Sequence, residues 1–227
     1  MKAKNWMLLL MKIKRRMQEV GFRQCFTEGL ARFGQMVGKN GRDEFDMKHR
    51  VDTGGKISLW ALNVNSPNAR FGIQYGAIGE DSLRNALKYI AAGEDLNKFS
   101  FVDVGCGKGR PLLIANDFNF RQLIGVEFVP SLAEIARSNI IKLDIKNAVV
   151  VEGDATVYPF PKEDMVIFLY NPFLRPVMEK MVNNLKNSMG GKLFVIYAHP
   201  NEQCLDLFNF LTQLNYPGSY VKIWKNA

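Results

Sequence analysis

The stretch Asp103-Val104-Gly105-Cys106-Gly107-Lys108-Gly109-Arg110 decides the fold of this chain. An apolar run begins at Phe101 and leads into it, and a helical pattern follows it. A strand that ends in a glycine-rich turn before a helix is typical of α/β proteins that bind nucleotides, because glycine permits a tight turn and lets a ligand lie against the backbone. In the dinucleotide fingerprint the third glycine stands where this chain has Arg110, so NAD is the poorer candidate ligand.

Strand-like and helical runs alternate over the rest of the chain. Continuous apolar runs predict strands at residues 101–104, 122–127, 148–152, 165–170, 192–198 and 219–225. Helical spacing predicts helices at residues 82–92, 112–118, 131–143, 175–188 and 202–214. Strands that are apolar throughout, separated by helices, indicate a parallel sheet covered on both faces. We therefore expect an α/β fold with a doubly wound, mostly parallel sheet that binds ligands at the carboxyl ends of its strands.

The carboxyl-terminal end of the chain predicts a shortened sheet. After the last expected helix only residues 215–227 remain, which is enough for one strand. A final antiparallel hairpin would then be incomplete. We expect either six strands or an edge that a segment from the amino-terminal part or another subunit covers, because an open edge invites pairing.

Acidic side chains follow the second and third predicted strands. Glu127 stands close to 20 residues after the glycine loop, where a carboxylate accepts hydrogen bonds from both ribose hydroxyls. Asp154, in Gly153-Asp154-Ala155, is placed to accept from an adenine amino group while a backbone N–H reaches a ring nitrogen. Glu127 alone is more often a solvated charge at a strand end. Together with the glycine loop, the two acidic residues favour one ligand that contains adenosine.

Four motifs in order resemble those of class I S-adenosylmethionine-dependent methyltransferases, which have a Rossmann-like fold. The resemblance covers about residues 99–198, and its motifs are residues 101–110, Gly125-Val126-Glu127, Gly153-Asp154-Ala155 and Asn171-Pro172-Phe173. It implies an enzyme with S-adenosyl-L-methionine as cofactor. The residues that it places around the methionine part and the ribose are Asp103, Gly105, Cys106, Gly107, Gly109 and Glu127, and those that it places near adenine and the methyl group are Asp154, Ala155 and Asn171.

The methyl acceptor is expected beside the end of the fourth strand. The candidate catalytic residues there are Tyr170, Asn171, Pro172 and Phe173. In methyltransferases that act on planar or amine nitrogens an Asn/Asp-Pro-Pro-aromatic motif stands here, and its carbonyls accept the hydrogens of the nitrogen. The resemblance thus implies methylation of an amine, an amide or a protein lysine by in-line displacement. The motif of this chain has one proline instead of two, and a plain Asn-Pro turn is an equal alternative.

A fainter resemblance is to the non-SET class of protein lysine methyltransferases. It rests on Tyr75-Gly76 before the first helix and on Asn171 and Phe173 after the fourth strand. Tyr75 is equally well explained as an aromatic residue that packs within a loop. A hydroxyl or ammonium acceptor would need a base, for which Tyr170 and His199 are the titratable candidates at strand ends.

Several enzyme classes are excluded by what the sequence lacks. The cysteines (Cys25, Cys106 and Cys204) are odd in number and far apart, and the chain has two histidines, so neither disulfides nor a metal site is expected. There is no G-x-S-x-G hydrolase motif. Gly107-Lys108-Gly109 lacks the Ser or Thr of a P-loop.

The positive charge is concentrated near the amino terminus. Residues 1–50 hold twelve Lys or Arg against five Asp or Glu, which is +7 of the net +8. Apolar residues recur there at helical spacing, which predicts a basic amphipathic helix in an appendage at residues 1–38. Such a helix could lie on an anionic membrane, bind an acidic protein or nucleic acid, or pack on the neighbouring domain.

The remaining chain divides into two parts. Residues 39–98 are expected to be a linker or lid and a first helix, with the aromatic residues Trp60, Phe71 and Tyr75 either in the lid or in the core. Residues 99–227 are expected to form the cofactor-binding domain. No apolar run reaches the roughly 20 residues of a membrane span, and the early apolar run has the wrong flank for a cleaved signal. We expect a cytoplasmic protein, with peripheral membrane attachment as an alternative.

Two other functions remain open at this stage. One is a non-catalytic module that binds an adenosine ligand. The other is a protein attached to a membrane or to nucleic acid, in which the basic helix carries the function and the α/β domain supports it.

Overall fold

The computed structural model describes residues 44–55, 57 and 75–227. These residues belong to one compact unit, which runs from residue 42 to residue 227. The helix expected within residues 1–38 and the lid candidates Trp60 and Phe71 lie outside the described residues.

Seven strands form a single sheet in the order β3-β2-β1-β4-β5-β7-β6. The five parallel strands are β1 (Ser100–Val104), β2 (Gln122–Glu127), β3 (Ala148–Glu152), β4 (Met165–Tyr170) and β5 (Leu193–Ala198). The antiparallel strands are β7 (Val221–Lys225), which pairs with β5, and β6 (Thr212–Gln213), which pairs with β7. The prediction of a doubly wound, mostly parallel α/β sheet is confirmed.

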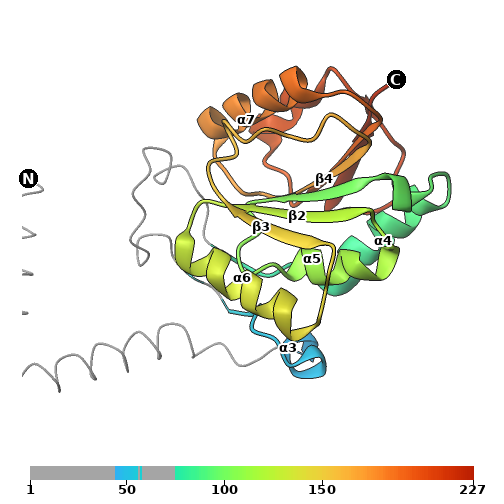
Figure 1. Cartoon of the computed structure of the whole chain (residues 1–227). Coiled ribbons are helices and arrows are strands. Elements are labelled where there is room, and N and C mark those ends of the chain that lie inside the picture. Colours follow the sequence, from blue (N-terminus) through green and yellow to red (C-terminus); the bar gives the residue numbers. More distant parts are fainter. Residues whose placement is uncertain (1–43, 56, 58–74) are drawn as a thin grey trace, which may run out of the picture. The chain divides into compact units, whose positions relative to one another are not determined.

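Helices cover both faces of the sheet, as Figure 1 shows. The α-helices are α3 (Glu44–His49), α4 (Glu80–Ala91), α5 (Arg110–Ala115), α6 (Pro130–Lys142) and α7 (Arg175–Ser188). The 3₁₀ helices are η3 (Leu96–Lys98), η4 (Asn116–Phe118) and η5 (Glu202–Phe208). One core cluster joins the sheet to α4, α5 and α6, and a second joins the opposite face to α7 and η5. Burial on both faces explains why the central strands are apolar throughout.

The helix boundaries follow from local sequence. On α4 the apolar residues Leu83, Leu87 and Ile90 share one buried face, as the helical spacing predicted. Both α6 and α7 carry proline in their first turn, at Pro130 and Pro176, where the missing N–H leaves no hydrogen bond unmade.

Two expectations about the carboxyl-terminal part are wrong. The sheet has seven strands rather than six, and the antiparallel hairpin is complete because Thr212 and Gln213 pair with Lys225 and Trp224. The helix predicted over residues 202–214 is a 3₁₀ helix that ends at Phe208, and strand β6 follows it. Its apolar spacing fits a helix, but the free side of β7 needs a hydrogen-bonding partner, and this segment supplies it.

The strand order places a crevice between β1 and β4. The chain passes from β1 outward to β2 and β3, and then returns to the other side of β1 to form β4 and β5. The connections after β1 and β4 therefore leave in opposite directions. In open α/β sheets ligands bind at this reversal, outside the carboxyl ends of the strands.

Two further expectations concern membranes and metals. Among the helices that the structure describes, none is long and apolar enough to cross a membrane. Within the same residues, no three side chains of His, Cys, Asp or Glu gather in a way that could hold a metal ion.

Candidate active site

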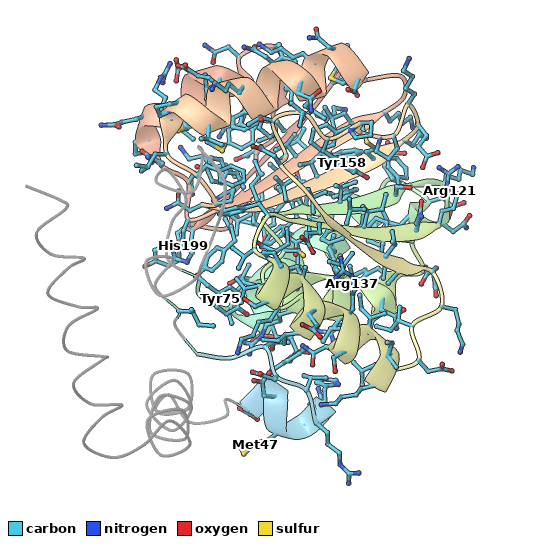
Figure 2. The ribbon with its side chains drawn as sticks, turned by 60° about the vertical axis from the view of Figure 1, so that its left-hand side comes forward. Met47, Tyr75, Arg121, Arg137, Tyr158 and His199 are labelled. Atoms are coloured by element: carbon cyan, nitrogen blue, oxygen red, sulfur yellow. The ribbon has the colours of Figure 1, made fainter. Side chains whose placement is uncertain are left out.

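A cavity of about 210 Å³ opens at the carboxyl ends of β1, β2, β4 and β5. Figure 2 shows two of its lining residues, Tyr75 and His199, at the same end of the domain, with Arg121 at the start of β2 at the opposite end. The candidate site residues that line this cavity are Asp103, Gly105, Cys106, Glu127, Tyr170, Asn171, Pro172 and Phe173. The tertiary structure therefore brings together residues from separate strand ends.

Gly107 and Gly109 shape the loop without lining the cavity. Both have positive φ, at 53° and 85°, which glycine adopts without steric cost. A Cβ on Gly107 would lie 2.2 Å from Cε2 of Tyr75, so the Tyr75 ring rests directly on the loop. A Cβ on Gly109 would lie 3.1 Å from the Cβ of Ala136 on α6, so this glycine permits close packing of the helix.

Glu127 fixes the glycine loop from the end of β2. Its Oε2 accepts the N–H of Gly107 at 2.7 Å and its Oε1 accepts the N–H of Val129 at 2.9 Å. Burial raises the pKa of Glu127 to about 7, although these backbone donors act to lower it. Because a carboxylate oxygen accepts more than one hydrogen bond, Glu127 can also receive ribose hydroxyls.

Asp103 is the unsatisfied group of the site. Its side chain is 2% exposed, and its Oδ2 has no hydrogen-bond partner among the described residues. Burial raises the pKa of Asp103 well above its ordinary value, and the charge of Glu127 raises it further. A buried carboxylate oxygen without a partner beside a cavity is suited to a cationic ligand. The methionine α-ammonium of S-adenosylmethionine is such a group, so the residues present fit this cofactor.

A second, narrower cavity continues from the first toward the end of β3. The two share the lining residues Gly105, Phe128 and Phe173. Asp154 and Ala155 line the second cavity, and Oδ1 of Asp154 accepts the N–H of Thr156 at 2.9 Å. This places the residues expected near adenine next to the residues expected near the ribose. The contribution of Phe128 was missed, although an aromatic residue directly after Glu127 was a usable signal.

The acceptor end has two residues in a backbone conformation that is uncommon without glycine. Asn171 and His199 follow the neighbouring strands β4 and β5, and their φ angles are 42° and 46°. Such outliers cluster at functional sites, because the surrounding structure must hold them in place. At Asn171 the side-chain Oδ1 lies 3.4 Å from the hydroxyl of Tyr197. Tyr197 was not among the predicted residues.

His199 belongs to an aromatic group at the cavity mouth. Its ring stacks on Tyr220 with 5.1 Å between centroids and meets Tyr170 edge-on at 5.5 Å. Tyr170 and His199 both line the cavity. Tyr220 was also missed, because it lies in the turn before β7 and carries no motif in the sequence.

The comparisons with known proteins agree with this geometry. The family model for a methyltransferase domain matches residues 101–189. This match covers less than half of the chain and assigns residues 101–189 to a methyltransferase domain. A search of curated protein sequences gives no match.

Solved structures share the fold at low sequence identity. The chain is 17% identical to yhhF from Escherichia coli, over 76% of this chain and 98% of that one, with a TM-score of 0.52. It is 17% identical to a mutant of MtNAS, over 63% of this chain and 58% of that one, with a TM-score of 0.50. It is 22% identical to the YcgJ protein from Bacillus subtilis, over 58% of this chain and 57% of that one, with a TM-score of 0.46. The match thus spans 57% of the length of YcgJ.

Proposed function

We propose that this protein methylates a nitrogen atom of an amine, an amide or a protein lysine by in-line displacement. The observation that carries this proposal is the position of Asn171 and Pro172. Both follow β4 directly in the cavity that Asp103 and Glu127 line, so an amide oxygen and backbone carbonyls stand beside the proposed cofactor site. An acceptor nitrogen can donate its hydrogens to these oxygens, which directs its lone pair.

The residues around the cavity have separate roles in this proposal. Asp103 and Glu127 hold the amino-acid and ribose parts of the cofactor, and Asp154 and Ala155 hold the adenine. When bound, S-adenosylmethionine supplies a methyl group on a sulfonium, whose sulfide leaves readily. Little acid or base catalysis is then needed, and the protein mainly aligns the acceptor and excludes water. Phe128 and Phe173, which line both cavities, are placed to exclude water.

The protonation state of the acceptor decides whether a base is needed. A neutral amine or amide can attack as it is. A lysine ammonium must first lose a proton, and the imidazole of His199, which lines the cavity, is a general base of a suitable type. His199 is therefore proposed as a base only for a charged acceptor.

The chemical linkage of the transferred methyl group tests the proposal. Purified protein is incubated with S-adenosylmethionine labelled in the methyl group and with a cell extract separated into proteins and small molecules. We expect label that is stable to mild base and that fragments as an N-methyl group in mass spectrometry. After acid hydrolysis it should remain on nitrogen, either as an N-methylated amine or as methylamine released from an amide. Label in a base-labile ester, an ether or a thioether would contradict nitrogen methylation.

A variant at Asn171 separates acceptor alignment from cofactor binding. Replacing Asn171 with Ala should lower the methylation rate by roughly 10- to 100-fold, the effect of losing one or two aligned hydrogen bonds. The affinity for S-adenosylmethionine should fall by less than the rate, because Asp103, Glu127 and Asp154 remain to hold the cofactor. Asn147→Ala is a matched control, since the Asn147 side chain donates to the carbonyl of Phe120, away from the cavity. An unchanged rate in Asn171→Ala would remove Asn171 from the proposal.

We also propose that the basic segment at residues 1–38 attaches the protein to an anionic surface. This proposal rests on the positive charge that the segment carries. The full chain should sediment with vesicles of about 30% phosphatidylserine at low salt, and a chain that begins at residue 39 should not. If both chains bind S-adenosylmethionine equally but neither sediments, attachment to this membrane is wrong. If only the full chain shifts an RNA probe, nucleic acid is the surface.

A further inference from the structure

A buried polar network joins the segment before the domain to the glycine loop. The carboxylate of Asp46 on α3 is 3% exposed and accepts the N–H groups of Thr53 and Gly54 at 2.7–3.0 Å. It also accepts the hydroxyl hydrogen of Thr53 at 2.5 Å. Residues 46–54 are therefore closed around one carboxylate and hold the Thr53 hydroxyl in a defined orientation.

This network fixes the guanidinium of Arg110, the first residue of α5. Its Nε–H donates to Oγ1 of Thr53 at 2.7 Å, and its Nη1 donates to the carbonyl of Ile78 at 3.2 Å. Its Nη2 lies 3.4 Å from Oδ1 of Asp46, and Phe45 packs against the guanidinium with 4.8 Å to the ring centroid. A long, flexible side chain is thus held in one place by three parts of the chain.

Arg110 also lines the cavity that contains Asp103 and Glu127. Of the described residues that line it, Arg110 is the one with a permanent positive charge. Lys108, the other cation of the glycine loop, does not line this cavity, because its Nζ binds Asp52 at 2.6 Å and the carbonyl of Gly54 at 3.0 Å. Both cations of the loop therefore bind the preceding segment, and of the two only Arg110 also lines the cavity.

Tyr75 lies between the preceding segment and the glycine loop. Its hydroxyl donates to the carbonyl of Thr53 at 2.5 Å, and its ring covers Gly107. Burial raises the pKa of Tyr75. Tyr75, Asp103 and Arg110 line the same cavity.

The chemistry of the cofactor matches this pair of charges. The amino-acid end of S-adenosylmethionine carries an ammonium and a carboxylate, and Oδ2 of Asp103 fits the ammonium. The carboxylate needs a partner of opposite charge, and a planar guanidinium matches a carboxylate in geometry. We propose that Arg110 binds the α-carboxylate of S-adenosylmethionine and that Asp46 and Thr53 act as positioning residues for its guanidinium. This inference rests on the proposed cofactor site.

Decarboxylated S-adenosylmethionine is the probe that isolates this contact. Calorimetric titrations of the full chain compare its affinity with that of S-adenosylmethionine. We expect the unaltered protein to prefer S-adenosylmethionine by about 10- to 100-fold, the range for a charge-assisted hydrogen-bonded pair. Arg110→Met should lose most of this preference and keep its affinity for the decarboxylated probe within about threefold, if the lost interaction is the carboxylate contact. Arg84→Met is the matched control, because Arg84 binds Glu80 and Asp117 outside the cavity.

The outcomes separate the Arg110 role from the cofactor site itself. If Arg110→Met weakens both ligands equally, or leaves the preference intact, Arg110 does not bind the carboxylate. If the unaltered protein binds neither ligand, the proposed cofactor site fails as well. Asp103→Asn should weaken both ligands, because both carry the ammonium.

Two further sets of variants distinguish loss of the carboxylate contact from a change in folding. Arg110→Lys keeps the charge without the planar fork and should retain part of the preference. Thr53→Val removes the hydroxyl that accepts from Arg110 and should lower the preference by about 3- to 10-fold, the effect of one hydrogen bond, whereas Thr53→Ser should restore it. If Thr53→Val keeps the full preference, Thr53 is not a positioning residue.

Discussion

At the scale of single residues, Asp103 and Glu127 form an electrostatic conflict in the domain without ligand. They belong to the ends of the neighbouring strands β1 and β2, both are buried, and the charge of Glu127 raises the pKa of Asp103. Groups arranged for binding often lower the stability of the protein without ligand in this way. The reason is that the ligand supplies the partner that such a group lacks in the free protein. The conflict predicts opposite effects of one substitution on stability and on binding.

Asp103→Asn should stabilise the domain without ligand while weakening cofactor binding. Because the folded-state pKa of Asp103 is raised, its favourable contribution is complete below the unfolded pKa near 4 and is lost as pH rises through the folded pKa. Asparagine stays neutral, so its advantage in melting temperature should be larger at pH 8 than at pH 5. The S-adenosylmethionine affinity should fall by about tenfold or more. A lower melting temperature at pH 8, or an unchanged affinity, would contradict this.

Glu127 should make cofactor binding depend on pH. Its pKa of about 7 means that the carboxylate that would accept the ribose hydroxyls is largely protonated at pH 6 and ionised at pH 8. The affinity for S-adenosylmethionine should therefore rise about tenfold over this interval. Calorimetry at pH 6, 7 and 8 measures it.

Glu127→Gln should reduce that dependence on pH. Glu152→Gln should preserve it, because Glu152 lies opposite Glu127 on β3 but is exposed. Equal slopes in Glu127→Gln and the unaltered protein would assign the titration to another group.

At the scale of elements, the glycine loop and the segment around Tyr75 fit together as one unit. Gly107→Ala should lower stability by about 1–3 kcal/mol, because its φ is positive and the new Cβ would overlap the Tyr75 ring. Urea unfolding measures this. Gly93→Ala is the matched control, since its Cβ would meet nothing within 4 Å and its φ is not positive. Equal stability of Gly107→Ala and the unaltered protein would mean that the ring does not pack on the loop.

The sequence pattern predicted strand β7 but not its hairpin partner β6. Trp224 on β7 pairs with Val195 on one side and with Gln213 on the other, and its ring stacks on Phe208 at 5.0 Å. Trp224→Ala should therefore destabilise the domain by about 3–5 kcal/mol. Lys225→Ala, at the exposed next position, should change the free energy of unfolding by less than about 0.5 kcal/mol. Comparable small losses in both variants would argue against β7 as a buried strand.

At the scale of the whole molecule, the site is built by contacts between distant parts of the chain. Asp52 and Asn139 are 87 positions apart and are joined by two hydrogen bonds, and Asn139 also donates to the carbonyl of Lys108. Arg110 and Asp46 are 64 positions apart. Residues 46–54 belong to the stretch expected to be a linker or lid, and they accept hydrogen bonds from Lys108 and Arg110 of the glycine loop.

Much of the fold could be predicted because its determinants are local. A strand buried on both faces is apolar throughout, so the five parallel strands were recognisable one by one. Glycine at positive φ, and an acidic residue at a fixed distance after it, mark the strand ends in the same way. Of the residues expected around the cofactor, all but Gly107 and Gly109 line one of the two cavities.

The sequence by itself determined the α/β class, the parallel strands and the residues at their carboxyl ends, because periodicity and glycine spacing act over a few residues. The tertiary structure alone decided that β6 completes the sheet, that Tyr75 covers Gly107 and that Arg110 faces the cavity while Lys108 does not. These features depend on hydrogen bonds and packing between residues that are tens of positions apart. No local pattern encodes such contacts, because they form only when the whole sheet and its covering helices are in place.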